Sequence, residues 1–342
     1  MKVGLYRHLV ASCMLGGVLM SPLAWGQAVI QSGDVKLGVR TDGALNVPDP
    51  GALEHGATGL TYALNGRDAL TPGCWCEAWG VADAVSSRFG STGAETGTQN
   101  IVVDSFTSTA STATSVVRVA DATGNLFRVT HAFAPSASGS LYRVDVTIEN
   151  ISGAATTVLY RRAMDWDVYP ERFNELTTVQ AGTSPNITFT SDDGFANGNP
   201  LSGPSSYLFT GNAVDSGPAD HGALFDFNFG SVAPGAQVKF TIFYGAAANQ
   251  QAAMTALGAM GAEAYSLGKP NPAAPGAGPE DGAPNTYIFA FAGIGGTPIA
   301  GGTPIAGGGS VAAVPVGGPM MLVSLFLAMG AAGSSMLRRR QR

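Results

Sequence analysis

The sequence predicts a mainly β protein, in which a large antiparallel β-sandwich with one helix lies between an N-terminal signal peptide and a C-terminal transmembrane helix. Three observations predict this arrangement. Apolar and polar residues alternate in about a dozen short segments of the body, residues 28–294. Turn residues such as glycine, asparagine and proline separate most of these segments. Each end of the 342-residue chain has an apolar run beside basic residues.

The alternation identifies the strands. In LYRVDVTIEN, residues 141–150, every second residue from Tyr142 to Ile148 is apolar and the residues between them are polar. Segments 223–230 and 237–245 repeat the pattern. Strands with one polar face form antiparallel sheets that pack face to face, so we expect one large sandwich. Further strands are expected at 35–40, 59–64, 101–107, 114–120, 125–133, 156–164, 186–190, 205–210 and 286–292.

One segment of the body has the composition of a helix. Residues 246–268 are rich in alanine, glutamine and methionine, and Leu257, Met260 and Ala264 recur at helical spacing. Gly268 suits a C-terminal cap. We therefore expect a helix at 246–268 that packs on a sheet or closes one end of the sandwich.

The N-terminus has the three parts of a secretory signal. Lys2 and Arg7 precede an apolar stretch at 9–23, and the small residues Ala24 and Gly26 occupy the −3 and −1 positions of a cleavage site. We expect residues 1–26 to be a signal peptide. The partners that follow are Sec-type export machinery and a signal peptidase.

The C-terminus predicts a linker and a membrane span. Residues 295–313 contain GGTPIA twice, followed by glycines, which is typical of a flexible linker. Residues 319–337 are uncharged and would span roughly 28 Å as a helix, close to a bilayer core. The arginine cluster at 338–342 favours a cytoplasmic C-terminus. A buried core helix is the alternative, but the segment lacks a polar stripe.

The last 29 residues resemble a class of sorting signals with three parts: a short proline-containing motif, a span and an arginine cluster. The segment 314–342 is similar to the PEP-CTERM and IPTL-CTERM signals of Gram-negative bacteria, although VPVG replaces IPTL here. The resemblance implies an exosortase-type sorting enzyme as a partner. It implies an exported protein that is anchored in the membrane by its C-terminal helix or sorted to the cell surface. The residues of the signal are Val314, Pro315, Arg338, Arg339 and Arg340.

The charge of the body excludes one class of partner. The two termini hold six of the 18 lysines and arginines and none of the 24 acidic residues. The body therefore keeps 12 basic against 24 acidic residues. A net negative body argues against nucleic acid as a partner. It suits a surface protein that meets divalent cations.

The densest group of charges in the body is RRAMDWDVYPERFNE, residues 161–175. Asp165 and Asp167 are two apart, so they would share one face of a strand and could bind one hard cation such as Ca²⁺. The alternative is a strand end whose ion pairs fix a loop. Candidate ligand or Ca²⁺ residues, here and in the turn 190–200, are Asp165, Asp167, Glu171, Asp192 and Asp193. An ordinary turn is the alternative for the second segment.

Cys74 and Cys76 are the cysteines that remain after removal of the signal peptide. In an oxidising compartment the pair predicts a local disulfide, which needs a turn because the two residues are so close in sequence. A free pair and metal binding are the alternatives. Aromatic residues near both motifs could stack on sugar rings, although packing in the core is the commoner role of such residues. They are Trp75, Trp79, Trp166 and Tyr169.

No known catalytic spacing occurs in the chain. The GxSxG, HExxH and P-loop patterns are absent, and we expect no catalytic residue and no cofactor other than Ca²⁺. The main hypothesis is an exported β-sandwich of structural, adhesive or extracellular-matrix type. The alternative is a carbohydrate-binding or carbohydrate-active module with polysaccharide as its partner. Open aromatic rings beside carboxylates would favour the alternative.

Overall fold

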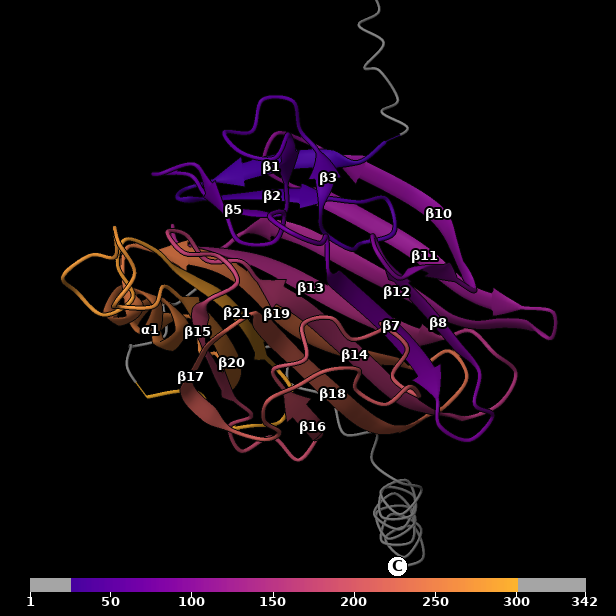
Figure 1. The fold of residues 1–342 in the computed structure, drawn as a ribbon. Coiled ribbons are helices and arrows are strands. Elements are labelled where there is room, and N and C mark those ends of the chain that lie inside the picture. Colours follow the sequence, from indigo (N-terminus) through magenta and orange to yellow (C-terminus); the bar gives the residue numbers. More distant parts are fainter. Residues whose placement is uncertain (1–25, 301–342) are drawn as a thin grey trace, which may run out of the picture.

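The computed structural model describes residues 26–300, which form antiparallel sheets and one helix (Figure 1). Two large sheets lie face to face and a smaller one packs at one end (Figure 1). The mainly β prediction is confirmed, and the sandwich architecture is supported. The smaller sheet has the order β1-β2-β5-β6, from Ala28–Ser32, Val35–Val39, Leu60–Tyr62 and Arg67–Asp68; β3 (Val47–Pro48) pairs with β4 (Ala57–Thr58).

The larger sheet of the sandwich has nine strands, and the facing sheet has six. The nine-stranded order is β10 (Ile101–Ser108), β11 (Ala113–Asp121), β12 (Gly124–Pro135), β13 (Leu141–Asn150), β19 (Gln237–Ala247), β21 (Thr286–Ala292), β20 (Ala264–Lys269), β15 (Glu175–Gln180) and β17 (Ala213–Ala219). The six-stranded order is β16 (Ile187–Ser191), β18 (His221–Val232), β14 (Thr156–Trp166), β7 (Glu77–Asp83), β8 (Phe89–Gly93) and β9 (Gly97–Gln99).

Aromatic rings fill the space between the two large sheets. Phe225 and Phe227 of the six-stranded sheet meet Phe289 and Phe291 of the nine-stranded sheet, and the Phe227–Phe291 ring centroids are 4.8 Å apart. Burial of each such side chain contributes about 1.5–3 kcal/mol. The alternation that predicts strands in the sequence is therefore the alternation that fills this core.

A buried ion pair joins two central strands of the six-stranded sheet. Arg162 of β14 donates from Nε to Oε1 of Glu77 on β7, and neither side chain is exposed. The other carboxylate oxygen of Glu77 accepts from the backbone N–H of Leu45 at 2.8 Å. Burial raises the pKa of Glu77, and Arg162 opposes that shift. This pair holds the strand that leads into the candidate site.

The helix prediction is wrong in its bounds. Helix α1 is Gln250–Ala259 only, and the side chain of Asn249 caps it by accepting from the N–H of Ala252. Residues 246 and 247 belong to β19, and residues 264–269 form β20 between β15 and β21. Pairing with neighbouring strands overrides the helix propensity of the segment. Gly268 is not a cap, because it lies in β20 where a Cβ would be 2.7 Å from the Trp166 ring.

The strand predicted at 205–210 is also wrong. Residues 205–210 form a loop, and their pairing is limited to one bridge between Ser191 and Thr210. Backbone N–H groups of this loop bond to the carboxylates of Asp192 and Asp193. Side chains therefore satisfy the backbone that a sheet would otherwise pair.

The predicted linker 295–313 begins within the described residues, and its first residues are attached to the body. The carboxylate of Glu263 accepts from the N–H groups of Gly293, Ile294 and Gly296. Ile299 donates its N–H to the carbonyl of Ala262 at 2.7 Å. The predicted signal peptide, apart from Gly26, and the predicted sorting segment 314–342 lie outside the described residues. Within residues 26–300, no helix has the length and apolarity that a membrane crossing requires.

Candidate acidic site

Four carboxyl groups meet where β14 ends beside β18. Asp165 is the last residue but one of β14, and Asp167 follows the strand. Trp166 pairs with His221 at the start of β18, so the residue after Trp166 lies next to Asp220. Glu175 pairs with Ala219, the residue before Asp220. Strand register thus gathers residues that are up to 55 positions apart in sequence.

Three of these carboxylates lie close enough to share one ligand. One oxygen each from Asp165, Asp167 and Asp220 lies within 4.8 Å of the other two. Asp165 is 3% exposed and Asp167 is fully buried, whereas Asp220 is exposed. The cluster therefore reaches the solvent through Asp220.

The two buried aspartates lack the partners that buried carboxylates normally have. Oδ1 of Asp165 and both carboxylate oxygens of Asp167 have no hydrogen-bond donor. Within residues 26–300, none of Asp165, Asp167 and Asp220 forms an ion pair. The other oxygen of Asp165 is 3.5 Å from Sγ of Cys74, which carries no proton because it is in a disulfide. Since a buried unpaired carboxylate is costly, the site is incomplete as it stands.

Burial and mutual repulsion shift the acids toward their protonated forms. Burial, followed by the charges of Asp165 and Glu175, raises the pKa of Asp167 to about 9. Burial, followed by the charge of Asp165, raises the pKa of Glu175 to about 9. The pKa of Asp165 is also raised, first by burial and then by Asp220. The backbone N–H groups of Val168 and His221, at 3.3 and 3.4 Å, are the hydrogen-bond donors to Glu175.

Glycines allow the backbone to close around the cluster. A Cβ at Gly222 would lie 1.9 Å from the carbonyl oxygen of Met164 and 2.7 Å from Cα of Asp165. A Cβ at Gly194 would lie 2.6 Å from the same Cα. The loop after β16 therefore packs directly on the end of β14 and fixes the backbone of Asp165.

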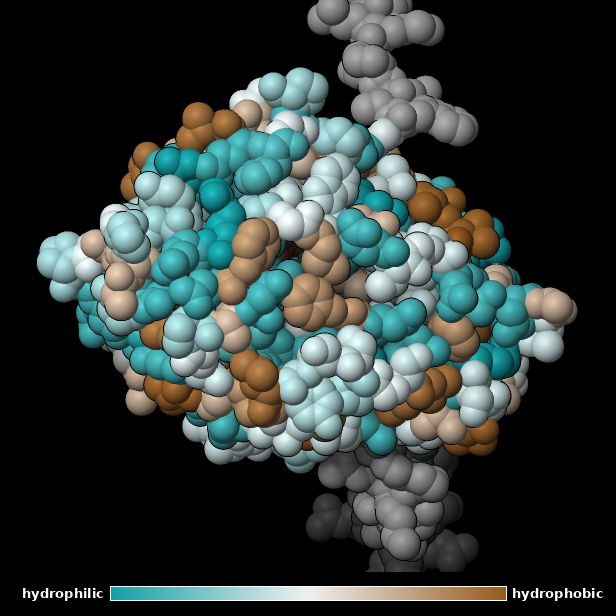
Figure 2. Space-filling model, in the orientation of Figure 1, coloured by the Kyte–Doolittle hydropathy of each residue, from teal (hydrophilic) through white to brown (hydrophobic). Residues whose placement is uncertain are grey.

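The rim of the site has two accessible aromatic rings. Phe173 is 47% exposed, and a Cβ built on Gly73 would meet both its ring, at 2.7 Å, and Oδ1 of Asp167, at 3.6 Å. The ring of Phe173 and the carboxylate of Asp167 therefore lie on either side of Gly73. Trp75 is half-buried between Cys74 and Cys76, which are joined by a disulfide with an S–S distance of 2.01 Å. Figure 2 shows a hollow in the surface near the start of β7, the strand that follows this disulfide.

The other predicted stacking residues are not available to a sugar. Trp79 and Trp166 are fully buried in the core. The guanidinium of Arg67 lies over the ring of Tyr169, 4.0 Å from its centroid. Packing and cation–π contact thus occupy three of the four rings that the sequence offered.

The remaining predicted ligand residues do not join the cluster that Asp165 and Asp167 form with Asp220. The carboxylate of Asp192 accepts from Nδ1 of His221 at 3.0 Å and from the backbone of the 205–210 loop. Although burial raises its pKa, these hydrogen bonds lower it more. Asp193 accepts from Ser205 and Ser206. Glu171 is partly exposed and does not belong to the group. Asp192 and Asp193 fix a turn, so the ordinary-turn alternative fits them.

Sequence reasoning missed Asp220, Glu175 and His221 as parts of this site. Asp220 and His221 follow a glycine and a proline, which indicate an ordinary turn. No spacing along the chain connects them with Asp165. The connecting signal is the pairing of β14 with β18, which only the fold supplies.

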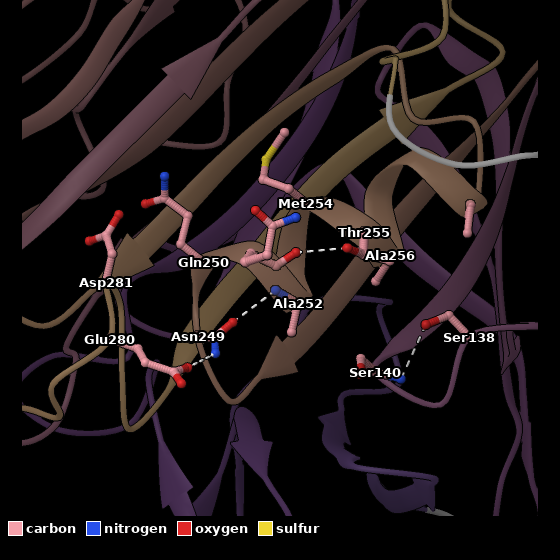
Figure 3. Close-up of a pocket in the computed structure, with 12 residues that line it drawn as sticks. Ser138, Ser140, Asn249, Gln250, Ala252, Met254, Thr255, Ala256, Glu280 and Asp281 are labelled. Atoms are coloured by element: carbon pink, nitrogen blue, oxygen red, sulfur yellow. Dashed lines mark hydrogen bonds between the residues drawn. The ribbon is translucent and has the colours of Figure 1, made fainter.

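Another hollow lies elsewhere, beside α1, and has a volume of about 950 Å³. Figure 3 shows Asn249 and Glu280 pointing toward one another there, and they are hydrogen-bonded. Oγ1 of Thr255 donates to a helix carbonyl at 2.9 Å. Among the described residues that line this hollow, none has a buried polar side-chain atom without a hydrogen-bond partner. The acidic cluster is therefore the better candidate site.

Three solved structures similar to this chain are named after aldose 1-epimerase or galactose mutarotase. One is a protein provisionally named aldose 1-epimerase from Escherichia coli K12, with 11% identity, a TM-score of 0.32, and coverage of 80% of this chain and 88% of that one. A galactose mutarotase-related enzyme from Lactobacillus acidophilus has 9% identity, a TM-score of 0.35, and coverage of 82% and 87%. A galactose mutarotase-like protein from Lactobacillus casei has 12% identity, a TM-score of 0.33, and coverage of 82% and 91%.

No protein family model matches the chain, and no curated protein matches it. At these identities and TM-scores the likeness transfers no residue and no reaction. The main functional hypothesis from the sequence, a structural or matrix protein without evident catalysis, is nevertheless wrong, because the similar structures are named as carbohydrate enzymes and their relatives.

Proposed function

We propose that the protein is a carbohydrate-active module that binds a sugar over the acidic site. The observation that supports this most directly is the pair of unpartnered carboxylates, Asp165 and Asp167, beside the exposed ring of Phe173. Sugar hydroxyl groups donate hydrogen bonds to carboxylates, and the apolar face of a sugar ring stacks on an aromatic ring. One carboxylate oxygen of Asp167 and the ring of Phe173 lie around one point of the rim.

Binding is tested by titration calorimetry of the purified 27–300 region against a panel of monosaccharides, oligosaccharides and soluble polysaccharides. The wild-type protein should bind at least one member. Phe173→Ala should weaken that binding about fivefold, because it removes a stacking ring worth about 1 kcal/mol. NMR of the bound sugar then reports whether it is converted.

The matched control is Val85→Ala. Val85 is 78% exposed and lies just beyond the far end of β7 from Trp75. This variant should bind as the wild type does. A folded wild-type protein that binds no member of the panel would refute the proposal, as would equal weakening by Val85→Ala and Phe173→Ala.

We infer further that the chain is exported and is anchored in the membrane or sorted to the cell surface. The support is the signal-like segment 1–26 and the three-part segment 314–342. The measurement is the intact mass of the native protein in each cell fraction. A mass that ends near residue 313, in the medium or at the outer surface, is expected from an exosortase-type enzyme. A mass that runs to Arg342, in the inner membrane, would contradict sorting and leave a permanent anchor.

A further inference from the structure

The acidic site has the composition of a cation site. Its three convergent carboxylates are oxygen donors, and one oxygen from each lies within 4.8 Å of the others. Oxygens bound to one Ca²⁺, at 2.3–2.6 Å from the ion, are separated by distances of this order. Cys74, whose Sγ lies 3.5 Å from a carboxylate oxygen of Asp165, is in a disulfide and offers no thiolate. The donor set therefore suits a hard cation rather than zinc.

A second observation points to a ligand at the same place. Asp165 and Asp167 are at least 97% buried, yet three of their four carboxylate oxygens have no hydrogen-bond partner. Buried carboxylates elsewhere in the described chain do have partners: Glu77 bonds to Arg162, and Asp42 bonds to Arg40 and Thr92. Because folding removes water from these oxygens, a proton or a cation must neutralise them, and a bound cation would displace the protons.

The backbone holds two of the donors in fixed positions. The N–H of Asp165 bonds to the carbonyl of Cys76, and the N–H of Asp167 bonds to the carbonyl of Ala69, both at 2.9 Å. The third donor, Asp220, is exposed and provides an entry path. Two fixed donors and one accessible donor leave part of a coordination shell open to solvent.

We propose that Asp165, Asp167 and Asp220 bind one Ca²⁺ ion, whose open side accepts hydroxyl oxygens of the sugar. The second half rests on the proposed function, whereas cation binding stands without it. Ca²⁺ suits the site better than Mg²⁺, because it accepts six to eight oxygens in an irregular geometry and Mg²⁺ requires a near-ideal octahedron. Vicinal hydroxyl groups of a sugar would complete the shell beside Phe173.

The cation is tested first, without sugar. The 27–300 region is stripped with EDTA and titrated with CaCl₂ by calorimetry, and its Tm is followed in parallel. Ca²⁺ at about 100 times its Kd should raise Tm by roughly 5 °C. Asp220→Asn should weaken Ca²⁺ binding at least about tenfold, because it removes one charged ligand. Since Asp220 is exposed, the substitution should leave folding unaffected.

The control is Asp104→Asn, which removes another exposed aspartate, on β10, that pairs with Arg118. It should bind Ca²⁺ as the wild type does. A flat wild-type titration, an unchanged affinity in Asp220→Asn, or tighter binding of Zn²⁺ than of Ca²⁺ would each overturn the cation site.

Sugar binding is then measured in CaCl₂ and in EDTA. Loss of sugar binding in EDTA supports the whole inference. Equal binding in both buffers would leave the proposed function standing and overturn the role of the cation in it. Ca²⁺ binding without any sugar binding would support the cation site and overturn the proposed function.

Discussion

Replacement of Arg162 by methionine is expected to lower the free energy of unfolding by about 3–5 kcal/mol. The variant leaves the carboxylate of Glu77 buried, with the N–H of Leu45 as its remaining hydrogen-bond donor among the contacts of the wild type. The lost guanidinium also donates to the carbonyl of Gly43 at 3.1 Å. Urea unfolding of the 27–300 region, followed by circular dichroism, measures the loss.

Two further variants separate the unpaired charge from the lost packing. In Arg162→Met with Glu77→Leu, both charges are replaced, so most of the stability should return. Arg128→Met, at a surface pair with Glu149 in which the two side chains are 42% and 24% exposed, should cost less than about 1 kcal/mol. A similar small loss in Arg162→Met would show that the buried pair is not what holds β14 to β7.

The strands of the core could be predicted from the sequence because the apolar residues that alternate along a strand are the ones that the fold buries. Tyr142 to Ile148 alternate in the sequence, and those apolar residues are buried against the facing sheet. Prediction from residue patterns fails where pairing with neighbouring strands determines the secondary structure of a segment. Residues 264–269 have the composition of a helix, yet β15 and β21 pair with both sides of them. The intrinsic helix or strand propensity of a segment does not show which strands will pair with it.

The candidate site could be predicted only in the part that is local in sequence. The two-residue spacing of Asp165 and Asp167 predicts that their side chains point the same way, and both belong to the cluster although Asp167 lies just after β14. Asp220 reaches them through the pairing of β14 with β18, which the sequence does not show. The aromatic residues were the weakest predictor, since Trp79 and Trp166 lie in the core. A tryptophan stacks on a sugar or packs in a core for the same apolar reason, and only its burial separates the two roles.

Replacement of Trp166 by alanine is expected to cost about 3–5 kcal/mol of unfolding free energy. The side chain is fully buried, and its Nε1 donates to Oγ of Ser266 at 3.0 Å. Its ring lies 6.4 Å from that of Tyr287, and the absence of a Cβ at Gly268 allows β20 to pack against it. The truncation would leave a cavity under the end of β14. Urea unfolding measures the loss.

The effect should extend to ligand binding, because Trp166 lies between Asp165 and Asp167 in sequence and anchors both to the core. At a temperature where Trp166→Ala is still folded, we expect its Ca²⁺ affinity to fall, while Trp166→Phe keeps most of the packing and loses about 1 kcal/mol with the hydrogen bond. Trp75→Ala is the control, since its half-buried ring lies outside the core and should cost little stability. If Trp166→Ala were as stable as Trp75→Ala and bound Ca²⁺ normally, the core would not position the carboxylates, and the loops around Gly194 and Gly222 would have to do so.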